Sequence, residues 1–129
     1  MAKEFTYRGK TLEELKAMPL EEFGKLCNSR ARRSLKEGFD KKLFSKILKY
    51  NPTNVKQKAI RTHSRDTVII PQMIGVKIAL YRGNTFELID VKPTMIGHYL
   101  GELILTRKRL MHGKAGIGAT KSSTAITAR

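Results

Sequence analysis

The fold is set by one stretch of the chain, GVKIALYRGNTFELIDV at positions 75–91. Apolar residues alternate with others along 76–82, which is the period of a strand with one buried face. Gly83-Asn84 is a two-residue hairpin signal, because both residue types accept positive φ angles. The return strand over 85–91 alternates less cleanly, and two adjacent large apolar residues in it permit a β-bulge. The stretch therefore predicts an antiparallel hairpin.

The segments on either side of this hairpin extend the sheet and add a helix. TVII at 67–70 is short, β-branched and followed by proline, so it is a candidate for a third strand. Pro93 suits the start of a helix, and large apolar residues then recur at helical spacing over 95–103. Gly97 and Gly101 are four apart in this pattern, so they would share one helix face and let another backbone come close.

Helices are predicted in the first fifty residues. Residues 11–14, TLEE, read as a capping box that opens a short helix, and Pro19 interrupts it. A second helix is expected over about 20–35, with acids in its first turn and bases near its end, and Gly38 stops it. Asp40 can cap a third helix. We expect these caps to fix where the helices begin.

The predicted fold class is α+β: N-terminal helices, a small three-stranded antiparallel sheet, a short helix and an extended basic C-terminal tail. Residues 55–65 read as a polar, basic connection without clear periodicity. After residue 105 the chain is rich in Gly, Ala, Ser, Thr and Lys, and such a segment cannot bury enough surface to fold alone.

The formal net charge of +15 is confined to two stretches. Residues 25–65 carry +11 and residues 104–129 carry +6, whereas 1–24 and 66–103 each carry −1. Basic segments without acids repel themselves unless a polyanion neutralises them. The charge distribution indicates a protein that binds nucleic acid.

Other function classes find little support in the residues. Cys27 is the single cysteine, so no internal disulfide or multi-cysteine zinc site forms, and it is expected to be a small buried residue. The three histidines lie in separate elements and form no metal-ligand pattern. Lys121-Ser122 lacks the preceding glycine and the strand of a phosphate-binding loop. The longest apolar runs are too short for a membrane span or signal peptide. No enzyme, cofactor or membrane partner is predicted.

The candidate RNA-binding residues follow the basic stretches. The run SRARRS at 29–34 places three guanidinium groups within four positions, and the planar fork of Arg suits phosphates. No ordered aromatic platform is evident, which favours phosphate and shape recognition over reading of single-stranded sequence. The candidates are Arg30, Arg32, Arg33, Lys36, Lys41, Lys42, Lys56, Lys58, Arg61, Ser64, Arg65, Arg82, His98, Arg107, Lys108, Arg109, Lys114 and Lys121.

Four stretches of the chain are distinctive as strings: RSLKEGF at 33–39, RTHSR at 61–65, IPQMIG at 70–75, and the block from Gly83-Asn84 to MIGHYLGEL at 95–103. Together they resemble small-subunit ribosomal protein family nineteen. The resemblance covers about residues 33–109, and the longer start and the tail from 112 to 120 are similar to the archaeal and eukaryotic branch. His63 stands where a bacterial member often has Trp, and Asn84 stands where Lys is frequent.

The resemblance implies a division of the chain and a set of contacts. It divides the chain into an N-terminal helical extension (1–32), a core domain (33–109) and a basic tail (110–129). It implies ribosomal RNA in the head of the small subunit, small-subunit protein thirteen as a neighbour, and a tail that reaches toward the decoding region and transfer RNA. The residues carried over as RNA contacts are Arg33, Lys36, Arg61, Ser64 and Arg65, with Gly97, His98 and Gly101 near RNA or in the fold's own packing.

Three hypotheses remain open from the sequence. The first is a structural ribosomal protein in the cytoplasm that performs no reaction. The second is a free architectural nucleic-acid-binding protein, which would bind duplex DNA and ribosomal RNA equally. The third is a nucleotide-dependent enzyme, which would bind ATP and lose it when Lys121 is replaced by Ala.

Overall fold

The structure is a computed structural model that describes residues 4–52 and 57–109. Its helices are α1 (Leu12–Ala17), α2 (Leu20–Leu26), α3 (Ser29–Glu37) and α4 (Lys41–Leu48). Its strands are β1 (Thr6–Tyr7), β2 (Lys10–Thr11), β3 (Ile60–Thr62), β4 (Lys77–Tyr81) and β5 (Phe86–Asp90). Single 3-10 turns are η1 (Pro71–Met73), η2 (Pro93–Met95) and η3 (Leu100–Glu102). The α+β class predicted from the sequence is confirmed.

The helices begin where side chains cap them. The Thr11 hydroxyl accepts a hydrogen bond from the Glu14 amide at 3.5 Å, and the Glu14 carboxylate accepts one from the Thr11 amide at 3.1 Å, which confirms the predicted capping box. One Asp40 carboxylate oxygen accepts from the amides of Lys42 and Leu43 at 3.0 and 3.1 Å. These bonds satisfy amides that have no partner within the helix.

The helix predicted over 20–35 is wrong in one respect, because the structure breaks it into α2 and α3 at Cys27-Asn28. The Asn28 side chain accepts a hydrogen bond from the Ala31 amide at 2.8 Å and so starts a new helix. A short amide side chain competes well for backbone donors at this position, which makes it a better cap than an interior helix residue. Gly38 ends α3 as predicted.

The central sheet has the strand order β3-β4-β5. The hairpin between β4 and β5 is confirmed, and the Arg82 amide donates to the Thr85 carbonyl at 2.9 Å across the predicted Gly83-Asn84 turn. The register is regular, with Ile78 opposite Ile89, so the bulge that the sequence permits does not form. The sheet is mixed rather than antiparallel, because β3 pairs with β4 in parallel.

The segment predicted as a third strand, 67–70, lies outside this sheet. It runs alongside residues 97–101, where the Ile69 amide donates to the His98 carbonyl at 2.8 Å and the Gly97 amide donates to the Ile69 carbonyl at 3.0 Å. Only Val68 and Tyr99 form a β-bridge there. The true third strand, β3, comes from the stretch read as a polar connection, because a three-residue strand is too short to show a period.

The helix predicted over 95–103 is replaced by the turns η2 and η3. Gly97 lies between them with φ +81°, a left-handed conformation that favours glycine, so it does not share a helix face with Gly101. The expected close approach still occurs at Gly101, where an added Cβ would lie 3.0 Å from the Arg65 carbonyl oxygen.

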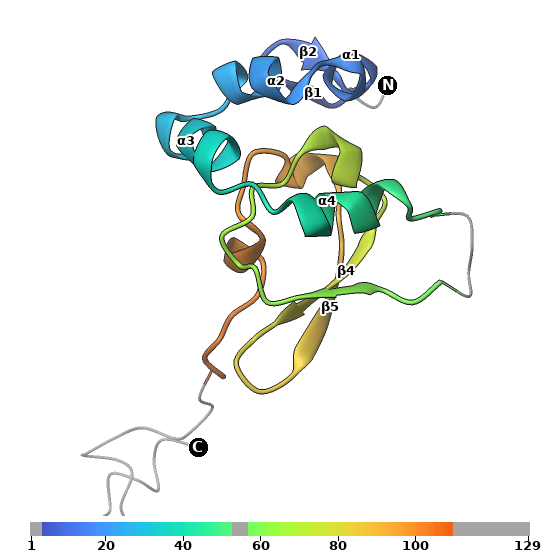
Figure 1. Cartoon of the computed structure of the whole chain (residues 1–129), viewed down its shortest axis with the longest axis vertical. Coiled ribbons are helices and arrows are strands. Elements are labelled where there is room, and N and C mark those ends of the chain that lie inside the picture. The colour runs from blue at the N-terminus through green and yellow to red at the C-terminus, as the bar shows by residue number, and fades with distance from the viewer. Residues whose placement is uncertain (1–3, 53–56, 110–129) are drawn as a thin grey trace, which may run out of the picture.

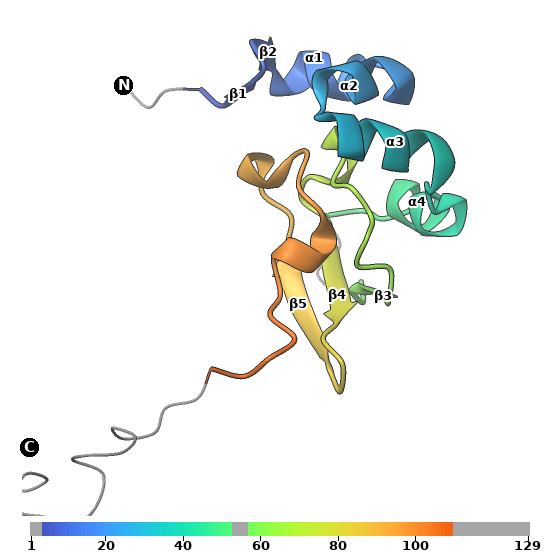
Figure 2. The same ribbon diagram turned by 90° about the vertical axis from the view of Figure 1, so that its left-hand side faces the viewer.

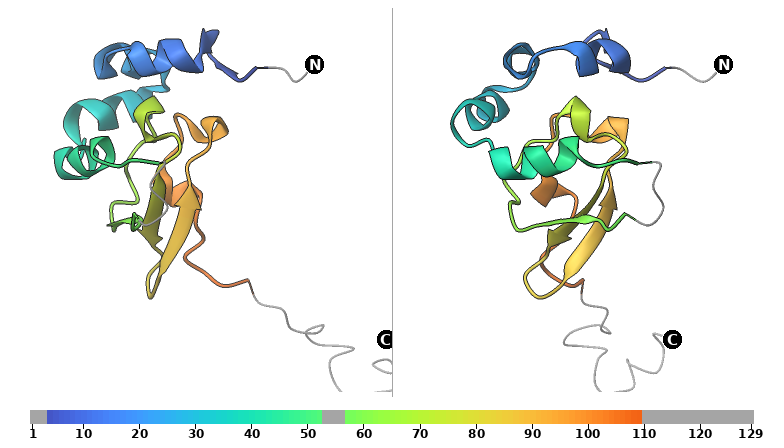
Figure 3. Two further views of the ribbon diagram at one scale, coloured as in Figure 1. Left: turned by 90° about the vertical axis from the view of Figure 1, so that its right-hand side faces the viewer. Right: turned by 45° about the vertical axis from the view of Figure 1, so that its right-hand side comes forward.

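One hydrophobic core joins the helices to the sheet. Leu15 of α1 and Phe23 of α2 belong to the same buried cluster as Ile78 and Leu80 of β4. Figure 1 and Figure 2 place α1 and α2 at one end of the long axis and the β4–β5 turn toward the other. Figure 3 shows that the described part of the chain ends on the side of the molecule away from α1.

Candidate nucleic-acid interface

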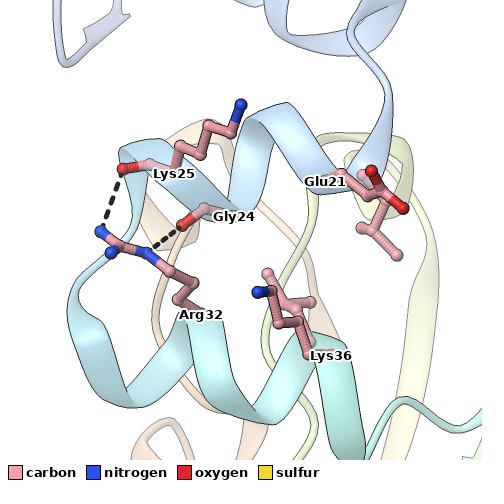
Figure 4. A pocket seen from close by; sticks show the side chains of 7 residues that line it. Glu21, Gly24, Lys25, Arg32 and Lys36 are labelled. Atoms are coloured by element: carbon pink, nitrogen blue, oxygen red, sulfur yellow. Dashed lines mark hydrogen bonds between the residues drawn. The ribbon is translucent and has the colours of Figure 1, made fainter.

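The first group of predicted residues lies on α3. Arg30, Arg32, Arg33 and Lys36 are all exposed, but their side chains have different partners. Arg32 donates to the carbonyls of Gly24 and Lys25, each at 3.3 Å, and so closes the end of α2 (Figure 4). Cations beside the last carbonyls of a helix complement its dipole. Arg32 therefore serves first to stabilise the end of α2, and any contact with RNA is a secondary role.

The groove between α2 and α3 is drawn in Figure 4. Its wall includes Lys25, Lys36 and Arg32, and Glu21 also lines it. The two helices pack closely at Gly24, where an added Cβ would make an ordinary van der Waals contact with the Leu35 side chain at 3.8 Å. Because an acid lines the groove and Arg32 is engaged by carbonyls, this groove is only partly free to bind an anion.

Two carboxylates lie within the first basic stretch, and both are engaged. Glu37 accepts from Arg33 at 3.0 Å in an exposed pair four residues apart on α3. Asp40 caps α4 with one oxygen, and its other oxygen accepts from the Ser64 hydroxyl at 3.3 Å. Ser64, a predicted RNA contact, is thus part of the fold's own hydrogen bonding. No lysine forms a salt bridge in the described part of the chain, so their charges are available to a partner.

Arg65 is the most engaged of the predicted RNA contacts. Its guanidinium donates to the carbonyl of Tyr81 at 2.8 Å, to that of Gly101 at 2.8 Å and to that of Ile104 at 2.6 Å. These three acceptors come from the end of β4, from η3 and from the residues that follow η3. Arg65 therefore holds Ile104, the last buried residue among those described, against the sheet.

His98 lies at the exposed side of the η2–η3 segment. Its Nδ1 is 2.8 Å from a Glu102 carboxylate oxygen. The His98 side chain is more than half exposed, and the Glu102 side chain is about half exposed. This hydrogen bond is the main cause that lowers the pKa of Glu102. Nearby, Gly97 faces the N-terminal hairpin, and an added Cβ would lie 2.6 Å from the Tyr7 hydroxyl. The same hydroxyl is 3.9 Å from the Cys27 sulfur, whose pKa is raised by burial, in keeping with the buried role predicted for it.

The outer face of the sheet brings together residues that sequence reasoning left apart. His63, just after β3, lies 4.5 Å from the Tyr81 ring and 5.1 Å from the Phe86 ring, centroid to centroid. Tyr81 and Phe86 are 5.2 Å apart and directly paired across the hairpin. We call these three rings the aromatic cluster. The Arg61 guanidinium carbon lies 5.5 Å from the Phe86 centroid, within reach of a cation–π contact.

The remaining predicted residues lie on α4, beside β3, at the hairpin turn and after η3, or fall outside the described residues. Lys41 and Lys42 are exposed in the first turn of α4, and Lys58 is exposed just before β3. Arg82 pairs with Glu87 at 3.4 Å, and Arg82 and Lys108 line a shallow depression at the hairpin turn. Arg107 and Arg109 are exposed. Outside the described residues lie Lys56, Lys114 and Lys121, together with the predicted tail.

No group of three His, Cys, Asp or Glu side chains that could hold a metal ion occurs within residues 4–52 and 57–109. None of the helices in that part of the chain has the length and apolar character that a bilayer crossing requires.

Comparisons with known proteins point to one family. The sequence model of the family described as Ribosomal protein S19 matches residues 32–112. The small ribosomal subunit protein uS19 of Saccharolobus solfataricus is 49% identical to this chain over 124 residues. That match covers 94% of this chain and 89% of the archaeal protein.

Proposed function

Because the chain belongs to the ribosomal protein S19 family, we propose that it locks folded ribosomal RNA in the head of the small ribosomal subunit. Membership makes it a structural, non-enzymatic protein of that subunit. We further propose that exposed cations neutralise the phosphates of the RNA and that the fold sets the positions of these cations. We place it with the ribosome in the cytoplasm.

One observation carries this proposal: the basic stretch from 25 to 65 has no spare negative charge. Its two carboxylates, Glu37 and Asp40, are already engaged within the fold. The lysines of α3 and α4 in the same stretch are exposed and lack a carboxylate partner among the described residues. The positive charges of such a surface repel one another unless a polyanion neutralises them. Phosphate contacts of this kind position a protein on nucleic acid.

The finer partners are proposed on the family resemblance. We infer that small-subunit protein thirteen lies beside this chain and that residues 110–129 extend toward the decoding region and transfer RNA. The described chain ends on the side of the molecule away from α1 (Figure 3), which supports this proposal.

The test is a salt titration of the full chain against an RNA fragment of the small-subunit head. If about eight phosphates are engaged, the logarithm of the binding constant should fall with the logarithm of salt concentration with a slope of about −6. A slope near zero would refute the proposal. Equal affinity for duplex DNA, together with absence from purified small subunits, would favour a free architectural protein instead.

A further inference from the structure

We propose that the outer face of the three-stranded sheet binds single-stranded RNA, with an unpaired base stacked on the aromatic cluster and its phosphates against the adjoining cations. This inference rests on the proposed function, and it adds base stacking to phosphate and shape recognition. It also revises the sequence prediction, which found no ordered aromatic platform.

The pairing of the strands creates the platform. Side chains alternate between the faces of a strand, so Tyr81 and Phe86 point to the face opposite the buried Leu80 and Ile89. The parallel pairing of β3 with β4 brings His63 to the same face, where it contacts both rings. Figure 2 shows the three strands side by side. Three rings from three chain segments therefore form one continuous aromatic surface.

The platform is open rather than covered. His63 is exposed, the Phe86 side chain is 36% exposed, and the neighbouring Leu88 on β5 is 70% exposed. Leu88 lies two residues after Phe86 on the same face of β5, so apolar surface continues along the hairpin from the rings. A contiguous apolar surface bordered by polar groups is typical of an interaction site.

The charge around this surface selects a polyanion as its occupant. Lys46 of α4 and Lys49 just after it, together with Lys58 and Arg61, line the depression that Phe86 and Leu88 also line. No Asp or Glu is among the described residues of that lining. The acid on this face of β5, Asp90, lies opposite Lys77 at the far end of the hairpin from Phe86. The groove between α2 and α3, by contrast, contains Glu21 and a guanidinium bound to carbonyls.

The combination of rings and cations fits a single strand better than a duplex. A base can reach a ring only when it is unstacked from its neighbours, as in loops and bulges of folded RNA. Aromatic stacking with a basic groove is how sequence-tolerant single-strand binders hold their ligand. A protein partner with an apolar anchor would use Phe86 and Leu88 but would not need four cations beside them, and the variants below separate the two.

The experiment measures binding of the full chain to a short oligouridylate that carries one 2-aminopurine, whose fluorescence falls when the base stacks. Phe86→Ala should weaken binding about tenfold, because stacking of one base contributes on the order of a factor of ten. Phe86→Leu should lose about as much, since it keeps an apolar side chain but no ring face. Phe86→Tyr should bind like the wild type. Leu48→Ala, which truncates an exposed leucine that does not line the depression, is the matched control.

Several results would overturn the inference. Phe86→Leu binding as tightly as the wild type would indicate apolar contact rather than stacking. A duplex RNA of equal length that competes as well as the single strand would indicate shape recognition alone. If Phe86→Ala lowers the thermal midpoint markedly, the test is made at the exposed His63 instead. His63→Ala should then weaken RNA binding several-fold, and His63→Phe should not. If the oligouridylate experiment fails but head RNA still gives a steep salt slope, only this inference is wrong and the proposed function stands. A flat salt slope on head RNA refutes the proposed function itself.

Discussion

Replacing Arg65 tests whether its charge serves the fold or the RNA. The guanidinium donates three hydrogen bonds of 2.6–2.8 Å to carbonyls, one of them on the buried Ile104. A hydrogen bond that involves a charged group contributes about 1.5–3 kcal/mol, and the half-buried setting of Arg65 places the sum near the lower end. We therefore expect Arg65→Met to lower the free energy of unfolding by about 4 kcal/mol.

Thermal unfolding followed by circular dichroism measures this loss. At about 4–8 °C for each kcal/mol in a domain of this size, the midpoint should fall by roughly 15–30 °C. Arg65→Lys should recover only part of it, since an ammonium group cannot bond three separated carbonyls at once. Arg30→Met is the control: Arg30 is exposed, so its loss should change stability by less than about 0.5 kcal/mol.

The salt slope of RNA binding completes the test. Removing a side chain that contacts a phosphate should shrink the slope by about 0.7, and we expect that change for Arg30→Met. For Arg65→Met, measured below its midpoint, the slope should stay that of the wild type, because this guanidinium is already bonded to carbonyls. If Arg65→Met unfolds like the wild type and loses one phosphate contact from the slope, our assignment of Arg65 to the fold is wrong.

Three other predictions follow from particular contacts. Gly97→Ala should lower the free energy of unfolding by roughly 2–3 kcal/mol, because its Cβ would lie 2.6 Å from the Tyr7 hydroxyl at a φ of +81°; Tyr7→Phe should recover part of this in thermal melts, and an unchanged midpoint would contradict it. The hydrogen bond from His98 lowers the pKa of Glu102, so its stabilisation is present above the carboxyl's unfolded-state pKa and is lost as pH falls through the lower folded-state value. NMR titration should find the Glu102 pKa raised in His98→Ala, and equal values would refute the pairing. A chain ended after Leu105 should keep its thermal midpoint, because Ile104 is the last buried residue described, but should bind RNA with a shallower salt slope; loss of folding would show that the division at the tail is misplaced.

Local signals in the sequence predicted local structure well. The capping box of Thr11 and Glu14, the Asp40 cap and the Gly83-Asn84 turn each depend on residues within a few positions of one another. The break between α2 and α3 could have been read from Asn28 as a cap, but an uninterrupted helical pattern of charges outweighed it. Local chemistry is therefore enough to place most helix ends and the hairpin.

Non-local pairing was beyond the reach of the same reasoning. Strand β3 has three residues and pairs in parallel with a strand more than a dozen residues later. Neither its length nor an alternation of apolar residues therefore predicts it from the sequence. Arg32 and Arg65 look like every other arginine in the sequence, and only the folded chain shows that backbone carbonyls engage them. The aromatic cluster was missed for the same reason, since His63 joins the two hairpin rings through β3.

The pairing of residues 65–69 with 97–101 has a consequence for a growing polypeptide. The capping bonds of the helices join residues two or three positions apart, so they can form before the sheet has been synthesised. The pairing closes a loop that contains the whole hairpin, so it waits until η3 has been synthesised. A nascent chain that stops before Gly97 leaves Val68 and Ile69 without their partner strand, and we expect chains of that length to be the most prone to aggregate.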